Sequence, residues 1–459
     1  MRKLSVSDLV KELDGVVVRE GSLSVVKSVV TRVKKVKPGC LYFCLDSKAP
    51  AVQETEQLPA CVMITSRPKR LPSLRGDITV IQVKKTREAY HHFLAWYRRL
   101  LSTPHLAITG SYGKTTTKEM VKYLLTENHH VKATKGNYNL FRSNAGVLTR
   151  MNENTDFGIF EFGVGKKGHL EKCVRCFSPF SVLITGIGTD HIERYGSQHL
   201  YAEEKAKLLK GAGVDQPIFL NSECDHSKRF ARSLPPGQII WFGTGEQADY
   251  RGSHIKYTDE GMTFTLTHAE KKYEAFVPAF GLHMVRNALG AIAAAHTFGV
   301  DIETLLQRLR TFPPLKRHLE ITNGLNGSTL IDDSWNSNSG SIEAALAVLQ
   351  EKSRGKNSVA VLGQINELGP EEIQEHKKIG RLIYNNQPGR LITIGERAAV
   401  MAREAVKCGM RARHVYMCGT PERALELIQK FADDQTVCLI KTSMRDSYGH
   451  FIRVLKDET

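Results

Sequence analysis

The segment HLAITGSYGKTTTKE, residues 105–119, carries residue types that bind polyphosphate. Residues 106–109 predict a strand and residues 118–125 a helix, with the glycines between them. Backbone N–H groups of such a loop, together with the positive end of the following helix, favour an anion. Lys114 would neutralise phosphate charge, and Thr115 would place a hydroxyl on Mg²⁺. The rest of the predicted binding loop is Gly110, Ser111, Gly113 and Thr116.

This loop departs from the GxxxxGK[ST] pattern, because position 108 is Ile and the nearest upstream glycine is Gly110. A plain glycine-rich turn between a strand and a helix is therefore an alternative. That alternative leaves unexplained why a lysine and three threonines follow the glycines.

Three further residues could join this chemistry. Glu161 ends an apolar strand, where a carboxylate at the carboxyl edge of a sheet can reach a metal-bound phosphate. His191 follows the predicted strand 181–185, and Lys205 lies fourteen residues further along. A single His or Lys is more often structural or solvated, so these residues point to a site only as a set.

The cysteines favour reduced thiols over a disulfide framework, because nine of them are scattered without a paired pattern. Cys173 and Cys176 form one CxxC, and no second CxxC accompanies it. A structural zinc site needs about four ligands, so a thiol pair is favoured over a metal site here.

The length and net charge of the chain limit the classes of function that it could have. With 459 residues, two to four domains are expected. No apolar run reaches transmembrane length and the N-terminus lacks a signal-peptide core, which predicts a cytoplasmic protein without a membrane partner. The net charge of +16 indicates a solvated basic surface or a negatively charged small substrate. Aromatic residues are not interleaved with the basic clusters, so no nucleic-acid partner is expected.

The apolar pattern predicts three α/β modules, with boundaries at 1–101, 102–314 and 315–459. In the first module, strands are expected at 40–45, 60–64 and 77–83 and a helix at 86–101. In the second, strands are expected at 157–162, 181–185, 217–221 and 238–242, an antiparallel hairpin at 262–266 and 273–277, and a helix at 287–298. In the third, strands at 330–331, 359–362, 391–394, 414–417 and 436–440 alternate with helix-length segments, which predicts a Rossmann-like open sheet.

Taken together, these segments resemble the Mur ligase family. The motifs that carry the resemblance are TGSYGKTTTKEM (109–120), KGNYNLFRSNAG (135–146), EFG (161–163), DHIERYGS (190–197) with Lys205, GLHMVRNALGA (281–291), KRHLE (316–320), DDSWNSNSGS (332–341), LGQINELG (362–369) with His376 and Gly380, and KTSMR (441–445). The resemblance implies an α/β, three-domain Mur ligase architecture with a central P-loop ATPase domain and a C-terminal Rossmann-like domain.

The resemblance also implies roles for individual residues. Lys114 and Thr115 would bind the phosphates of ATP and a first Mg²⁺, while Glu161 and His191 would hold a second Mg²⁺. Lys205 matches the family's carbamoylated lysine, a modification that converts a cation into a metal-compatible anion. Expected contacts with adenine, ribose and phosphate fall on Asn287, Asp333 with the adjacent Asn336, and Arg317.

The implied activity is ATP-dependent amide bond formation through an acyl phosphate. The donor would be a UDP-muramoyl peptide or a similar anionic molecule, and the acceptor an amino acid or a dipeptide. The branch that the motifs resemble most adds D-alanyl-D-alanine to a UDP-N-acetylmuramoyl tripeptide. The enzyme is expected to act as a monomer.

Departures from the family pattern leave two alternatives open. Cys40 replaces an acid in the first module, Gln364 replaces an Asp, and KTSMR stands in place of KGSR. A ligase of secondary-metabolite or polymer synthesis would fit such changes. A catalytically silent nucleotide-binding partner is the other alternative, against which the set Lys114, Glu161, His191 and Lys205 argues.

Overall fold

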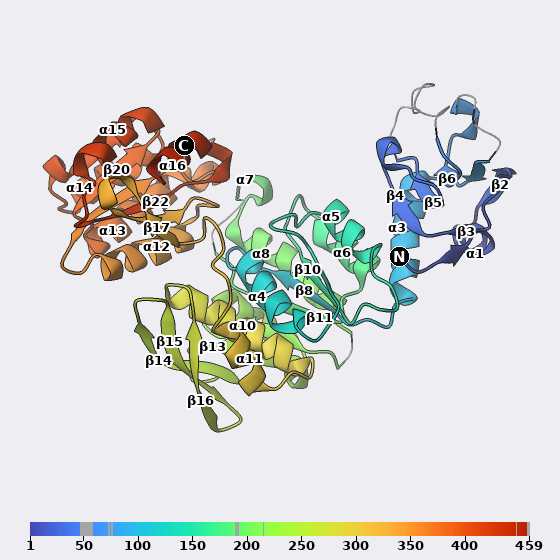
Figure 1. Cartoon of the computed structure of the whole chain (residues 1–459), viewed down its shortest axis with the longest axis horizontal. Coiled ribbons are helices and arrows are strands. Elements are labelled where there is room, and N and C mark those ends of the chain that lie inside the picture. Colours follow the sequence, from blue (N-terminus) through green and yellow to red (C-terminus); the bar gives the residue numbers. More distant parts are fainter. Residues whose placement is uncertain are drawn as a thin grey trace. The chain divides into compact units, whose positions relative to one another are not determined.

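The computed structural model describes residues 1–45, 58–71, 74, 77–188, 192–213, 215–446 and 448–456. The chain divides into two compact units. The first comprises Met1–Ala107, Thr126–Val182 and Lys207–Gln216, and the second Ile108–Leu125, Leu183–Ala206 and Pro217–Thr459. The three module boundaries derived from the sequence stay a prediction. The α/β fold class is confirmed, because helices alternate with strands of largely parallel sheets (Figure 1).

A five-stranded sheet forms near the N-terminus in the order β2-β7-β6-β5-β4. Its strands are β2 (Val16–Arg19), β4 (Ser28–Val30), β5 (Cys40–Phe43), β6 (Cys61–Thr65) and β7 (Thr79–Gln82), and β1 (Leu4–Ser5) pairs separately with β3 (Val25–Val26). The three predicted strands of this module are confirmed as β5, β6 and β7. The sequence did not predict β2, because Val16, Val17 and Val18 are exposed and show no alternation with polar residues.

Helix α3 (Thr86–Arg99) packs on this sheet through its aromatic face. The ring of Phe43 lies 5.1 Å from that of Tyr90 and 5.3 Å from that of Phe93. The other helix of the module, α1 (Val6–Glu12), is capped by Ser5, whose side chain accepts a hydrogen bond from the N–H of Asp8.

A nine-stranded sheet has the order β16-β15-β14-β13-β12-β11-β8-β10-β9. Its strands are β8 (His105–Thr109), β9 (Val131–Ala133), β10 (Phe157–Glu161), β11 (Ser181–Ile184), β12 (Ile218–Asn221), β13 (Ile239–Gly243), β14 (Tyr250–Tyr257), β15 (Met262–His268) and β16 (Lys271–Val277). The associated helices are α4 (Lys114–Thr126), α5 (Phe141–Leu148), α6 (His169–Phe177), α7 (Ile192–Tyr195), α8 (Gln198–Ala206), α9 (Asp225–Ala231), α10 (Leu282–Thr297) and α11 (Ile302–Leu309).

The predicted hairpin is confirmed as β15 and β16, which pair antiparallel from Met262 opposite Val277 to His268 opposite Lys271. A third antiparallel strand, β14, was not predicted. Most residues of its sequence, YRGSHIKY, are only partly buried and several are polar, so it lacks the apolar run of a buried strand.

The C-terminal sheet has six strands in the order β17-β18-β22-β19-β20-β21. Its strands are β17 (Glu320–Asn323), β18 (Thr329–Asp333), β19 (Asn357–Leu362), β20 (Arg390–Ile394), β21 (Val415–Cys418) and β22 (Thr436–Lys441). The helices are α12 (Ser339–Lys352), α13 (Glu372–Asn386), α14 (Ala398–Lys407), α15 (Pro421–Phe431) and α16 (Gly449–Leu455). All pairs are parallel except β17 with β18.

Successive residues of these strands bury into two separate cores, one on each face of the sheet. Ile331 and Leu439 belong to one core, whereas Leu330 and Cys438 belong to the other. Each of these strands must therefore be apolar along its length. The Rossmann-like open sheet that was predicted from such apolar runs is confirmed.

The nine cysteines are free thiols, as predicted, and Cys173 and Cys176 are buried on α6. In the part of the chain that is described, no helix is both long and apolar enough to cross a membrane.

A buried histidine at the start of β8 makes stability depend on pH. The ring of His105 stacks on that of Phe160 at 5.4 Å, and its Nδ1 lies 2.5 Å from the carbonyl oxygen of Thr103. Burial, with the charge of Arg98 as a smaller cause, holds the pKa of His105 well below 6.5. The folded chain therefore resists protonation here, whereas the unfolded chain accepts a proton near pH 6.5.

We expect this difference to remove stability as the pH falls. Between pH 7 and pH 5, the free energy of unfolding should fall by about 2 kcal/mol more in the wild type than in His105→Phe. Urea unfolding at the two pH values measures this difference. The exposed His254, replaced by Gln, is the control; equal pH dependence in wild type and His105→Phe would contradict the assignment.

Candidate nucleotide and ligase site

The predicted phosphate loop lies between β8 and α4, and its first glycine is sterically required. Gly110 has φ of +151°, and a Cβ at this position would lie 2.1 Å from Thr185 Oγ1 and 2.9 Å from the carbonyl oxygen of Gly186. The N–H of Ser111 donates to that same Gly186 carbonyl at 2.7 Å. The end of β11 therefore presses directly against the loop, and only glycine fits there.

The second glycine brings a predicted adenine contact to the loop. Gly113 has φ of +77°, and an added Cβ would lie 2.4 Å from Asn287 Oδ1. Asn287 is buried on α10. Helix α4 starts directly after Gly113, and Thr115 and Thr116 lie in its first turn, where the N-terminal end of the helix favours phosphate.

Two lysine ammonium groups converge on one backbone oxygen of this loop. Lys114 Nζ donates to the carbonyl oxygens of Gly110 at 2.8 Å and Ser111 at 3.1 Å. Lys205 Nζ, from α8, donates to the same Gly110 oxygen at 2.6 Å, although Lys205 is only 1% exposed. The sequence places these lysines 91 residues apart (205 minus 114), and the fold brings them together. The partly exposed ammonium of Lys114 favours an anion beside this loop.

Hydrogen bonds with neighbouring side chains hold Glu161 in place. It is fully buried at the end of β10, and its Oε1 accepts a hydrogen bond from Asn139 Nδ2 at 3.0 Å. Its carbonyl oxygen accepts from Asn144 Nδ2 at 3.0 Å, and its N–H donates to Thr134 Oγ1 at 3.0 Å. Asn139 and Asn144 lie in the 135–146 motif, but no local sequence pattern marks them as partners of Glu161. An immobilised carboxylate with a neutral amide partner suits a hard divalent cation.

His191 lies outside the described residues, so the structure does not place the predicted set Thr115, Glu161, His191 and Lys205 as one centre. Within the described ranges, no group of three or more His, Cys, Asp or Glu side chains is arranged to hold a metal ion.

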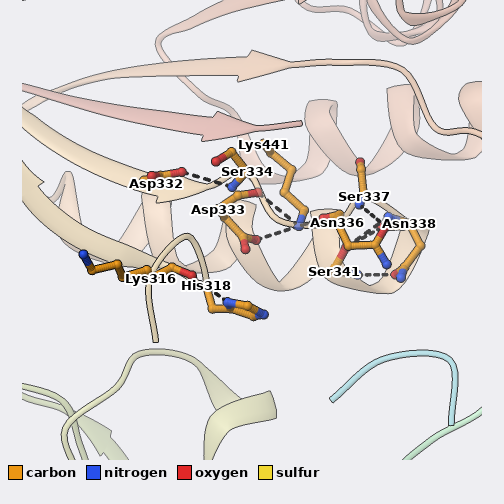
Figure 2. A network of polar contacts seen from close by, with 10 residues as sticks. All are labelled: Lys316, His318, Asp332, Asp333, Ser334, Asn336, Ser337, Asn338, Ser341 and Lys441. Carbon is orange, nitrogen blue, oxygen red and sulfur yellow. Dashed lines mark hydrogen bonds and ion pairs between the residues drawn. The ribbon is translucent and has the colours of Figure 1, made fainter. Parts of the chain in front are cut away.

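A second polar network surrounds the predicted ribose residue (Figure 2). Asp333 lies directly across from Lys441 in the β18–β22 register, and Lys441 Nζ contacts Asp333 Oδ2 at 2.7 Å. The same ammonium donates to the carbonyl oxygen of Asn336 at 2.6 Å. Lys441 is 1% exposed, so this one cation holds both predicted ribose-side residues. Lys441 opens the KTSMR motif, but the motif alone does not indicate this role.

The preceding aspartate has a separate partner. Asp332 Oδ2 contacts Lys456 Nζ at 2.8 Å, and Asp332 Oδ1 accepts a hydrogen bond from the N–H of Ser334 at 3.1 Å. Because consecutive strand residues point to opposite faces, each aspartate needs its own lysine. Asn338 then ends the loop as the N-cap of α12, in a capping box with Ser341 (Figure 2).

Arg317, the predicted phosphate contact, is joined to this network through its backbone. Its φ is +62°, its N–H donates to Glu320 Oε2 at 3.1 Å, and its carbonyl oxygen accepts from the N–H of Trp335 at 3.3 Å. The structure therefore brings Arg317, Asp333 and Asn336 together, and separately brings Lys114, Lys205 and Asn287 together.

Substitution of the first loop glycine tests whether this loop binds nucleotide. Gly110→Ala forces a methyl group against Thr185 and Gly186, so ATP affinity should fall by at least roughly tenfold while the remaining fold persists. Isothermal titration calorimetry with ATP measures the change. Gly237→Ala, where an added Cβ meets nothing within 4 Å, is the matched control. Unchanged ATP affinity in Gly110→Ala would exclude this loop as the phosphate site.

Removal of Lys441 should leave Asp333 as an uncompensated buried charge. We expect Lys441→Met to lower the free energy of unfolding by about 3 to 5 kcal/mol, measured by urea titration. The double variant Lys441→Met/Asp333→Asn should recover much of this loss, because it removes the stranded carboxylate. Equal stability of the single and double variants would show that the ion pair is not the cause.

Two protein-family domains match parts of the chain. The Mur ligase middle domain matches residues 108–295, and the Mur ligase glutamate ligase domain matches residues 317–444. Among curated relatives, the UDP-N-acetylmuramoyl-tripeptide--D-alanyl-D-alanine ligase of Bacillus subtilis is 30% identical over 347 residues, which cover 74% of this chain and 73% of the relative. The protein of the same name from Escherichia coli is 26% identical over 403 residues, which cover 87% of this chain and 87% of the relative.

Solved structures agree with this relationship at the level of the fold. MurF from Acinetobacter baumannii gives a TM-score of 0.87 at 22% identity, covering 100% of this chain and 99% of that one. MurF from Thermotoga maritima in complex with ADP gives 0.78 at 16% identity, covering 94% and 97%. The predicted Mur ligase architecture is confirmed by these matches, and the chain belongs to the Mur ligase family.

Proposed function

We propose that the protein is an ATP-dependent ligase that joins D-alanyl-D-alanine to a UDP-N-acetylmuramoyl tripeptide, the activity named for its relatives from Bacillus subtilis and Escherichia coli. The observation that carries the proposal is the glycine loop of the family's middle domain, in which Lys114 is held at the Gly110 carbonyl where α4 begins. This arrangement supports binding of ATP phosphates rather than of a single small anion.

The chemistry that this chain's residues would perform follows from the substrate. A carboxylate is a poor electrophile, because its leaving group would be oxide. Transfer of the γ-phosphoryl group of ATP to a carboxylate oxygen gives an acyl phosphate and ADP. Lys114, with the N–H groups at the start of α4, would stabilise the charge on the transferring phosphoryl oxygens. The acceptor amine then attacks the acyl carbon, phosphate leaves, and the amide forms after loss of a proton.

The remaining predicted residues would orient the nucleotide. Asn287 lies beside Gly113 and is proposed to contact adenine. Asp333, held by Lys441, is proposed to accept hydrogen bonds from ribose hydroxyls, with Asn336 beside it. Arg317 is proposed to contact phosphate.

Magnesium fits the residues that the structure describes. Glu161 presents a fixed carboxylate and Thr115 a hydroxyl, and both are hard oxygen donors. When bound, Mg²⁺ would supply charge neutralisation during phosphoryl transfer. Lys205 as an ammonium group cannot ligate a cation, and its contact with Gly110 is the contact of an amine donor. Carbamoylation of Lys205 would replace this ammonium group with a negatively charged one, leaving Lys114 as the cation at the phosphates, and we include this modification and His191 in the proposal.

The proposed setting is the cytoplasm, where ATP and nucleotide-linked precursors are found, with the protein acting as a monomer on small-molecule substrates. A Mur-type ligase with another donor or acceptor is the second candidate. Cys40, Gln364 and the KTSMR segment favour it, because they replace family residues in the modules proposed to hold the two substrates.

Kinetic measurement on Lys114 tests the proposed activity. With ATP, Mg²⁺, UDP-N-acetylmuramoyl tripeptide and D-alanyl-D-alanine, Lys114→Met should lower kcat/KM by roughly 100- to 1,000-fold, because a cation that stabilises the transition state is lost. Release of ADP and phosphate that depends on the amine is the readout, with mass spectrometry of the product.

The matched control is Lys122→Met, an exposed lysine on the same helix that pairs with Glu119 at 3.8 Å. This variant should keep wild-type rates. Coupling of other donors or amines, but not of these two, would favour the second candidate. Wild-type turnover in Lys114→Met would refute the assigned phosphate site.

A further inference from the structure

A buried histidine on α13 has no task in the proposed nucleotide chemistry. His376 belongs to the motifs that carry the family resemblance, and it is only 1% exposed. The N–H of Ile365 donates to its Nε2 at 3.3 Å, and its Nδ1 lies 2.7 Å from the carbonyl oxygen of Glu372. A carbonyl oxygen can only accept, so Nδ1 carries the hydrogen, and Nε2 keeps its lone pair for Ile365. The contacts therefore select one neutral tautomer.

Ile365 lies in the loop 363–371, which connects β19 to α13. The side chains of Ile365 and Leu368 are buried in one core of the C-terminal sheet. Between them the backbone turns sharply, with φ of +63° at Glu367. This left-handed conformation is unfavourable for glutamate, so it persists only where surrounding contacts hold the loop. The hydrogen bond to His376 is one of these contacts.

Two polar side chains of the loop contact Asp446, which directly follows the KTSMR segment. Gln364 Nε2 and Asn366 Nδ2 donate to Asp446 Oδ1 at 3.4 and 3.2 Å. The other carboxylate oxygen of Asp446 accepts from the N–H of Ser443 at 3.3 Å. The loop thus holds a segment of the module that is proposed to bind the acceptor amine.

Glu367 extends the contacts of the loop to α7. Its Oε1 accepts from Arg194 Nη2 at 2.6 Å and contacts Arg445 Nη1 at 2.5 Å. Its carbonyl oxygen accepts from the N–H of Glu193, at the start of α7, at 3.3 Å. One loop therefore joins two segments that are far apart in the sequence, and movement of the loop would disturb both.

Protonation of His376 would break its contact with Ile365. The charged groups near the ring are Glu372 and Glu375 on its own helix and Arg397 before α14, which pairs with Glu372 at 3.1 Å. Burial lowers the pKa of His376 from its usual 6.5, although the two carboxylates and the Glu372 carbonyl act in the opposite direction. The folded chain therefore keeps the ring neutral at pH 7. A second ring N–H would face the N–H of Ile365, and neither group could accept.

We propose that His376 is a positioning residue, which as the neutral Nδ1–H tautomer holds the loop 363–371 in the conformation that use of the acceptor amine requires. Gln364, Asn366 and Glu367 transmit the effect, because they are the loop residues that contact the neighbouring segments. The kinetic part of this inference rests on the proposed function, whereas the tautomer and the loop contact do not.

Nuclear magnetic resonance tests the tautomer. In the full chain with ¹⁵N in the histidine rings, the signals of His376 are assigned by their absence from His376→Gln. At pH 7, Nδ1 should be protonated and Nε2 unprotonated. A titration then gives the pH range over which the ring gains its second proton. A protonated Nε2 in the folded protein at pH 7 would overturn the proposal.

Hydrogen exchange tests whether this ring holds the loop. His376→Met removes the acceptor, so amide exchange within 363–371 should become roughly tenfold faster. His376→Gln should restore most of the protection, because the glutamine Oε1 can lie where Nε2 lies and accept from Ile365. Wild-type exchange rates in His376→Met would contradict the role of the ring.

The matched control is Ile428→Val on α15. Ile428 is buried in the core on the other face of the C-terminal sheet, and it lines neither the loop nor His376. Removal of one methyl group there perturbs the same module, but exchange within 363–371 should stay at the wild-type rate. Faster loop exchange in this control, equal to that of His376→Met, would overturn the proposal.

Acceptor kinetics test the consequence for turnover. His376→Met should raise the KM for D-alanyl-D-alanine by roughly tenfold and leave the KM for ATP unchanged, and His376→Gln should restore most of the loss. The ratio of the wild-type KM to that of His376→Gln should be constant at neutral pH and should rise over the pH range in which the His376 ring is protonated. Titration of the acceptor amine affects both proteins equally and cancels in this ratio. A wild-type KM in His376→Met, or a constant ratio while the ring becomes protonated, would refute the positioning role.

The behaviour of wild type separates this proposal from the proposed function. If wild type forms no product with D-alanyl-D-alanine, the acceptor assigned under the proposed function is wrong. The resonance and exchange measurements need no turnover, so they then decide. The Nδ1–H tautomer together with faster loop exchange in His376→Met supports the positioning role, and the absence of either result overturns it.

Discussion

The carbonyl oxygen of Gly110 accepts hydrogen bonds from two ammonium groups, and the arrangement of the proposed active site depends on this contact. It requires a glycine at the end of β8, because Thr185 and Gly186 leave no space for a side chain. It also requires α8 to deliver Lys205 to a loop that lies 95 positions earlier in the chain.

A second constraint acts in the C-terminal sheet. The parallel register of β18 and β22 sets Asp333 opposite Lys441, and alternation along β18 gives Asp332 a different lysine on the other face. Each carboxylate is thus neutralised inside the fold, and the loop that follows β18 is held by Lys441. This loop carries Asn336, so one buried ion pair positions a proposed nucleotide contact.

Local patterns explain which features the sequence predicted. The strand, glycine loop and α4 are contiguous, so spacing alone predicted the phosphate loop. The buried strands of the C-terminal sheet were predicted because both of their faces are covered, which demands continuous apolar runs. By contrast, β14 and β2 are partly exposed, and their residue patterns carry too little apolar signal. Asn139 contacts Glu161, and Lys441 contacts Asp333, because the fold brings separate segments of the chain together. The spacing of residues along the sequence does not indicate these contacts. Lys205 was a candidate from its position in the chain, and its metal-side role came only from the resemblance to the Mur ligases.

The loop between β8 and α4 is proposed to activate a carboxylate by phosphorylation. Transfer of ¹⁸O tests it most directly, with a donor whose reacting carboxylate carries ¹⁸O in both oxygens. In the proposed reaction, a donor oxygen leaves with the phosphoryl group. The released inorganic phosphate should therefore carry a single ¹⁸O atom, and the amide product should retain the other. Label in AMP, or phosphate without label while the amide forms, would contradict the account.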